Sequence, residues 1–182
     1  DVAHDGAGCV RVEREGVDVG AGWAERADLA EGRSGEGCLV FADLHYMLAL
    51  AGDNRPDSAA RLTARVAQSA QEECDQGLVM KNPGLAAAEG LAAFGEGQYD
   101  MAFAQLRAAQ PAFQIMGASH AQRDVFERVT IDEGLRAGRL DEAAALIAER
   151  TDKRNGAVDA FADTRMKQIA DARALKATVA AE

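Results

Sequence analysis

A polar run at residues 119–124 contains the side chains with the clearest capacity for binding chemistry. It reads Ser-His-Ala-Gln-Arg-Asp. On a helix, His120, Arg123 and Asp124 fall on one face, because residues three and four positions apart are neighbours. An imidazole, a guanidinium and a carboxylate on one face can bind a ligand that carries a carboxylate or a phosphate. The sequence therefore predicts ligand or partner contacts at these three residues.

The same run has a structural interpretation, which stays open as an alternative. Ser119 is a good N-cap for a helix that starts at His120. Asp124 can form a surface ion pair with Arg128 four positions later, an arrangement that contributes about 0.3–0.5 kcal/mol on a helix. In this interpretation the run only starts and stabilises a helix.

His45 is the fourth candidate contact. It follows Phe41 by four positions and precedes Leu48 by three, at the edge of an apolar helix face. This position favours a half-buried core histidine. Asp43 points in another direction on a helix, so it forms no local acid–base pair with His45. His45 and His120 can act together only if neighbouring helix pairs bring them to one concave surface.

Signatures of catalysis and of cofactor binding are missing from the sequence. We find no HExxH, CxxC or GxSxG motif and no phosphate-binding glycine loop. The three cysteines, Cys9, Cys38 and Cys74, lie far apart, which is poor support for a zinc site or a disulfide framework and suits a reducing compartment. We therefore expect no catalytic residue, metal or cofactor, and a cytoplasmic location.

The charge of the chain bears on its partners. The formal net charge is −10 and the pI is near 4.8. This acidity argues against nucleic acid and against an anionic membrane surface as partners. The longest apolar stretch, around residues 44–51, is far too short to cross a bilayer. An acidic groove favours a protein or peptide partner with basic segments.

A turn pattern that occurs three times predicts the elements that position these residues. Each copy starts with a residue suited to the left-handed conformation that ends a helix, and has an acid three positions later and an alanine five positions later. The starting residues are Asn54, Gly97 and Gly138. The small alanine lets the next helix pack closely. The pattern predicts an all-α fold of antiparallel helix pairs.

The spacing of the copies is 43 and 41 residues. A tetratricopeptide repeat (TPR) has a period of about 34 residues, and HEAT-like pairs have about 40–47. The spacing matches the longer class, whereas the turn chemistry matches the shorter one. We expect a TPR-like right-handed α-solenoid that ends in a capping helix, as repeat arrays require.

These signals predict one helical repeat domain over residues 1–182. The expected helix pairs cover about 9–32, 39–74, 83–116 and 120–151, with the capping helix at about 157–180 and a loop at 75–82. Pro83 should open a helix pair, and Pro111 should kink or end a helix. Met101, Leu106 and Phe113 are expected in the core. Since residue 1 is Asp rather than Met, we expect a fragment of a longer chain.

Four stretches together resemble the C-terminal half of the tetratricopeptide repeat protein 38 family, over roughly residues 9–155. They are residues 16–23, from Gly16 to Trp23, and residues 41–47, 117–126 and 135–150. The resemblance implies a helical repeat fold and scaffold behaviour, with no catalytic site to transfer. One feature departs from the repeat pattern. The small residue expected seven positions before the turn is present as Gly90, but Met47 and Ile131 replace it in the other copies.

Three functions follow as hypotheses. The first is a scaffold that binds a protein or peptide on a concave helical surface. The second is a small-molecule-binding protein or enzyme with His45, His120, Arg123 and Asp124 in a pocket between repeats and a histidine as general base. The third is a homo-oligomer that forms through an exposed apolar face of the first helix pair.

Overall fold

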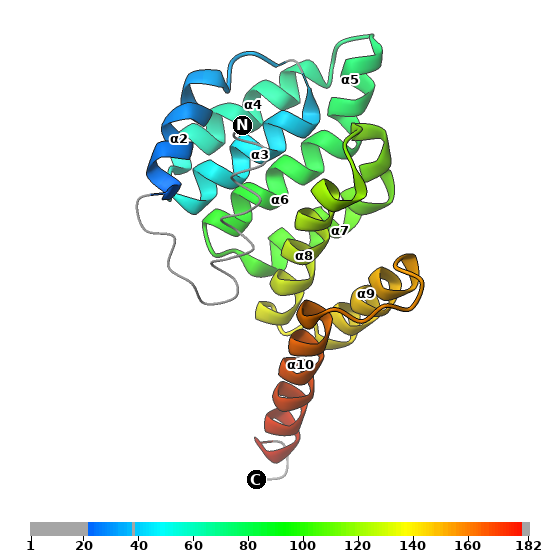
Figure 1. The fold of residues 1–182 in the computed structure, drawn as a ribbon. Helices are drawn as coiled ribbons and strands as arrows, with labels where there is room; N and C mark the ends of the chain where they lie inside the picture. Colours follow the sequence, from blue (N-terminus) through cyan, green and yellow to red (C-terminus); the bar gives the residue numbers. More distant parts are fainter. Residues whose placement is uncertain (1–21, 38, 180–182) are drawn as a thin grey trace.

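The computed structural model describes residues 22–37 and 39–179, and within these ranges every regular element is helical (Figure 1). The all-α prediction is therefore confirmed for them. Expectations for residues 9–21 and for Cys38 lie outside the described residues. The elements are α2 (Gly22–Arg33), α3 (Val40–Gly52), α4 (Pro56–Ser69), α5 (Asp75–Val79), the π-helical turn η1 (Met80–Gly84), α6 (Leu85–Gly95), α7 (Tyr99–Ala109), the 3-10 helix η2 (Gln110–Met116), α8 (His120–Arg136), α9 (Leu140–Lys153) and α10 (Ala160–Val179).

The three predicted turns reverse the chain as expected. Asn54, Gly97 and Gly138 have positive φ angles of 53°, 70° and 73°. At each turn, the N–H of the next residue donates to the carbonyl five positions earlier in the preceding helix, at 2.9 Å. This bond satisfies a carbonyl that the end of the helix would otherwise leave open. The turns join α3 to α4, α6 to α7, and α8 to α9 as antiparallel neighbours.

Small residues set how closely the paired helices approach. The alanines of the three turn patterns, Ala59, Ala102 and Ala143, are buried. At the α6–α7 crossing, a methyl group added at Gly90 would lie 2.8 Å from Cγ of Leu106. At the α8–α9 crossing the close approach falls on Gly134, where a methyl group would lie 3.3 Å from the Cβ of Ala143. Gly134 thus provides the small residue at the α8–α9 crossing, whereas the repeat pattern would place it at position 131, where this chain has Ile131.

Helix α3 is the most enclosed element. It packs against α2, α4 and α6, and residues 43–50 are all buried. The prediction of a half-buried His45 is therefore wrong, because the side chain has no exposed surface. A helix with neighbours on three sides buries polar positions outside its apolar face as well.

Two other local expectations are corrected. Residues 75–81 are helical rather than a loop, since the sulfur of Cys74 accepts from the N–H of Gly77 at 3.3 Å and caps α5. Asn82 then adopts an extended conformation (φ −150°, ψ 114°), so the next helix still opens at Pro83. Met101 is 48% exposed rather than in the core, because α7 turns Phe103 inward instead.

The remaining expectations for this region are confirmed. Leu106 and Phe113 are buried, as expected. The α-helical part of α7 ends at Ala109, just before Pro111, and the chain continues as the 3-10 helix η2. Proline lacks the N–H that an α-helix needs at this point.

Helix α10 covers part of the last helix pair. Its first half buries Phe161, Ala162, Arg165 and Ile169 and packs against α9. In its second half, Arg173 pairs with Asp141 of α9 and Lys176 donates to the carbonyl of Gly138. The C-terminal end of α10 projects beyond the other helices (Figure 1), and Leu175 and Val179 there are 67% and 65% exposed. No helix in the described ranges is both long enough and apolar enough to cross a membrane.

The close α6–α7 crossing makes a testable prediction for Gly90→Ala. The added methyl group meets Cγ of Leu106 and the backbone of α7, so the helices must separate. We expect a loss of about 1–3 kcal/mol in the free energy of unfolding, measured by urea denaturation. Gly32→Ala is the control, since no atom lies within 4 Å of its added methyl group and alanine favours a helix. Equal stability of Gly90→Ala and wild type would contradict the close crossing.

Candidate functional site

Ser119 sets the start of α8 through a capping box. Its Oγ accepts from the N–H of Gln122 at 3.3 Å, and the Gln122 side-chain oxygen accepts from the N–H of Ser119 at 2.9 Å. The predicted N-cap is confirmed. The helix therefore begins at His120 and carries His120, Arg123 and Asp124 within its first turns.

Arg123 is bound by the loop that precedes α8. Its Nη1 donates to the carbonyl of Gly117 at 2.8 Å and also to that of Ala118, and its Nη2 lies 3.4 Å from Nδ1 of His120. An arginine can only donate, so Nδ1 of His120 is the acceptor in this contact. Among the described residues, no carboxylate lies within ion-pair distance of Arg123.

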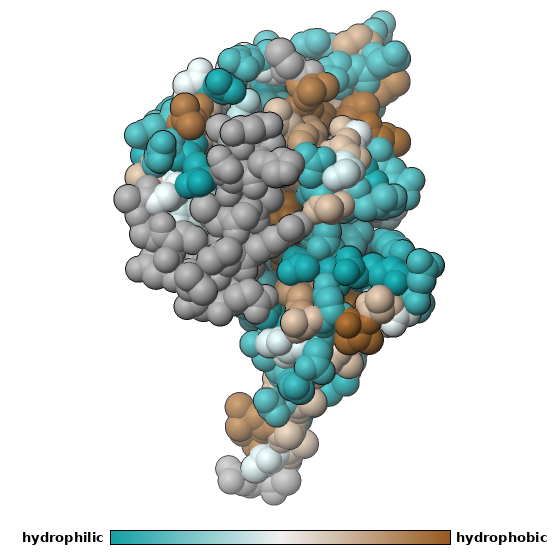
Figure 2. Space-filling model, viewed as in Figure 1, coloured by the Kyte–Doolittle hydropathy of each residue, from teal (hydrophilic) through white to brown (hydrophobic). Residues whose placement is uncertain are grey.

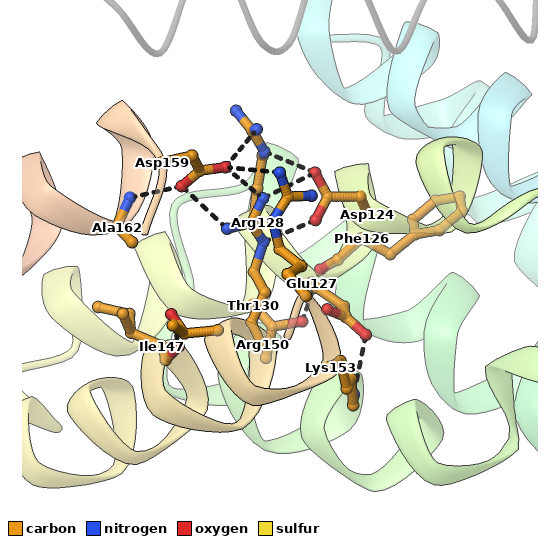
Figure 3. A network of polar contacts seen from close by, with 12 residues as sticks. Asp124, Phe126, Glu127, Arg128, Thr130, Ile147, Arg150, Lys153, Asp159 and Ala162 are labelled. Carbon is orange, nitrogen blue, oxygen red and sulfur yellow. Dashed lines mark hydrogen bonds and ion pairs between the residues drawn. The ribbon is translucent and has the colours of Figure 1, made fainter. Parts of the chain in front are cut away.

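Asp124 belongs to an ion network instead (Figure 3). Its Oδ2 lies 2.8 Å from Nε of Arg128, so the predicted pair is present. Its Oδ1 lies 2.6 Å from Nε of Arg150, whose side chain is only 3% exposed. The pair is not confined to the surface, since a buried arginine of α9 shares the same carboxylate.

Arg150 links three helices through this network. Its Nη1 and Nη2 donate to both carboxylate oxygens of Asp159 at 3.0 and 2.8 Å, while its Nε and Nη2 donate to Asp124 (Figure 3). Asp159 also accepts from the N–H of Ala162 in the first turn of α10 at 3.0 Å. The sequence analysis missed Arg150 and Asp159, because no local spacing relates them to Asp124.

The network changes the pKa values of its members. Hydrogen bonding to Arg150 lowers the pKa of Asp159 well below its usual range, against the effect of burial. Burial raises the pKa of Asp124, but hydrogen bonds and charge from Arg150 and Arg128 outweigh it, so the net shift is downward. Burial lowers the pKa of Arg150, and its two carboxylate partners more than reverse this. Asp124 is therefore a fixed anion at neutral pH and a poor proton acceptor.

Two adjoining hollows lie beside this network, of about 350 and 540 Å³. They share His120, Arg123, Glu127 and Lys153, and together we call them the α8 cleft. The remaining lining residues are Ala121, Asp124, Arg150 and Arg154 in the smaller hollow and Arg107, Gln110, Pro111, Phe113, Gln114 and Glu149 in the larger one. These volumes are in the range of known ligand sites. Figure 2 shows mainly hydrophilic surface where α8 and α9 meet.

The structure leaves His45 apart from the other three candidates. Its Nδ1 lies 2.8 Å from the carbonyl of Phe41, and its ring centroid lies 4.2 Å from that of Phe41 and 5.1 Å from that of Phe126. Asp43 pairs with Arg65 of α4 rather than with His45; burial raises the pKa of Asp43, and Arg65 opposes the rise. His120, Arg123 and Asp124 line one cleft, whereas His45 packs in the core.

Metal binding finds no support in the described part of the chain. Across residues 22–37 and 39–179, no cluster of three histidine, cysteine, aspartate or glutamate side chains could hold an ion. Comparisons with known proteins suggest no reaction or ligand for this chain, because no family model and no solved structure matches it.

The network predicts a large stability loss for Arg150→Met. Removal of the guanidinium takes from Asp124 and Asp159 their buried arginine partner and leaves them only the more exposed Arg128, which costs about 3–5 kcal/mol for a buried pair. Arg107→Met is the control, since it breaks the exposed pair with Glu149 and a hydrogen bond to Gln110, and should cost about 1 kcal/mol or less. Urea denaturation of both variants measures the difference. Similar losses in the two variants would contradict a central role of Arg150.

The lowered pKa of Asp159 predicts how stability depends on pH. Because its folded pKa is below its unfolded value, its contribution is complete above about pH 4 and is lost as pH falls further. At pH 7, Asp159→Asn should be less stable than wild type by about 2 kcal/mol, and the gap should narrow toward about pH 3. Asp163→Asn, which removes an exposed carboxylate of α10, should keep the acid-side slope of wild type. A constant gap for Asp159→Asn at all pH values would contradict the assignment.

Proposed function

We propose that this chain is a TPR-like scaffold that binds a protein or peptide segment in the α8 cleft. The observation that carries the proposal is the position of the cleft between successive helix pairs. Arg107 of α7 and residues of η2 line one side, and residues of α8 and α9 from the next pair line the other. Stacked helix pairs form such grooves, and extended or helical segments bind in them.

A right-handed solenoid arrangement is part of this proposal. Support comes from the tight turns that join α3 to α4, α6 to α7 and α8 to α9, and from the packing of α3 on α6 and of α7 on α8 in successive pairs. The resemblance to the tetratricopeptide repeat protein 38 family points to the same scaffold behaviour. The close helix crossings at Gly90 and Gly134 are compatible with regular stacking.

The chemistry of the cleft suits recognition better than catalysis. Pro111 offers exposed apolar surface, and Gln110 and Gln114 offer amide groups. A histidine that acts as general base is normally oriented by a third group such as a carboxylate. The nearest candidate, Asp124, is already held by Arg128 and Arg150. The volume of the cleft still favours small-molecule binding as the second candidate function.

A steric block of the cleft tests the proposal. Peptides are selected from a random display library on the full chain, and their affinities are then measured for Gln114→Trp and for Gln71→Trp. Gln114 is exposed and lines the cleft, whereas Gln71 is an exposed residue that follows α4. We expect the selected peptides to lose at least about tenfold in affinity with Gln114→Trp, equivalent to about 1.4 kcal/mol, and to bind Gln71→Trp like wild type.

Two outcomes contradict a peptide-binding cleft. One is a selection that enriches no peptide. The other is enrichment of peptides that bind Gln114→Trp as well as wild type. A metabolite that stabilises wild type against heat but not Gln114→Trp, with no peptide enriched, would favour the small-molecule alternative.

A further inference from the structure

We propose that the segment bound in the α8 cleft is acidic, with carboxylate side chains beside an apolar residue. This inference rests on the proposed function and names the chemistry of its partner. It runs against the net charge of −10, which by itself favours a basic partner. The charges that line the cleft differ from those of the whole chain, because basic side chains there outnumber acidic ones by five to three.

Most charges at the cleft neutralise one another. Lys153 pairs with Glu127 at 3.1 Å, and Arg107 pairs with Glu149 at 3.0 Å. The ion network contains two arginines, at 128 and 150, and two aspartates, at 124 and 159, so it is close to neutral as a unit. These groups form the walls of the cleft and contribute little net charge.

Two guanidinium groups provide the excess positive charge. Arg123 donates to the backbone carbonyls of Gly117 and Ala118, which are neutral acceptors. Arg154 is 44% exposed and reaches Asp159 only at 3.8 Å, where the same oxygen already accepts from Arg150 at 2.8 Å. Both guanidiniums keep donors for an incoming carboxylate.

The carbonyl bonds of Arg123 also favour tight binding. They hold the long side chain at the cleft before a partner arrives, so that less rotamer freedom is lost on binding. A carboxylate that meets Arg123 therefore gains a charge-assisted hydrogen bond at low entropic cost. The exposed ring of Pro111 in the larger hollow gives an aliphatic side chain apolar surface to pack on near it.

The surroundings limit how much negative charge the cleft can accept. Glu127 and Glu149 line it, and the chain as a whole is strongly acidic. A nucleic acid or another polyanion would be repelled at longer range, whereas a short segment with a few carboxylates contacts the two arginines at close range. This charge pattern favours an acidic peptide segment of another protein.

A matched peptide series tests the charge preference. Three fluorescent peptides share two leucines in the same positions and differ only in their flanking residues, which are glutamate, glutamine or lysine. Fluorescence anisotropy with the full chain measures each affinity. We expect the glutamate peptide to bind at least about tenfold more tightly than the glutamine peptide. The lysine peptide should bind most weakly, and added salt should weaken the glutamate peptide most.

Three single substitutions locate the effect. Arg123→Gln should weaken the glutamate peptide by at least about tenfold, and Arg154→Gln by about two- to fivefold. Lys81→Gln, which removes an exposed lysine of η1 outside the cleft, is the control and should change nothing. Arg154→Gln keeps the test valid if Arg123→Gln disturbs the loop before α8. None of the three should weaken the glutamine peptide.

Failure of this inference differs from failure of the scaffold proposal. If the glutamine or lysine peptide binds as tightly as the glutamate peptide and Gln114→Trp still blocks it, the acidic preference is wrong and the peptide-binding cleft stands. If no peptide binds and the Gln114→Trp selection is also negative, both are wrong. If inorganic phosphate at millimolar concentration does not displace the glutamate peptide, the assignment of the ligand as a peptide is supported. If phosphate alone binds and Arg123→Gln weakens its binding as much as that of the glutamate peptide, the cleft is a small-anion site rather than a peptide site.

Discussion

The chain reverses direction at single residues in the left-handed conformation, and this constraint underlies the arrangement of the helices. At Asn54, Gly97 and Gly138 the backbone bond to the carbonyl five positions earlier leaves room for only a short connection. The next helix must then run back along the one before it, and buried glycines and alanines let the two approach closely. The position of α9 beside α8, which forms one side of the α8 cleft, follows from this geometry at Gly138.

The charges of Arg123 and Asp124, which are neighbours on α8, have different roles. Asp124 turns toward α9, where Arg150 also binds Asp159 and so joins α8, α9 and α10. Arg123 lies on the cleft and is held by backbone carbonyls. The charge of Asp124 stabilises the packing of the helices, because the buried Arg150 requires carboxylate partners. The charge of Arg123 remains available to a ligand, which is why a chain with a net charge of −10 can present a locally basic cleft.

Sequence reasoning succeeded where a feature depends on neighbouring residues. The left-handed turn residues, the Ser119 cap and the helix end before Pro111 were all predicted, since each follows from a local rule of backbone geometry. It failed where packing decides the outcome. Met101 was expected in the core, but the rotation of α7 buries Phe103 instead, and residues 75–81 form helix because a cysteine caps them.

The sequence by itself therefore determined where helices begin, end and turn back, because those signals lie within a few residues of one another. It also brought together His120, Arg123 and Asp124 on one helix end. Only the tertiary structure decided that Asp124 binds Arg150, since that partner lies 26 positions away. It likewise placed His45 in the core rather than at the cleft, because three helices surround α3. Burial and ion pairing across helices depend on packing over long sequence separations, which local patterns do not record.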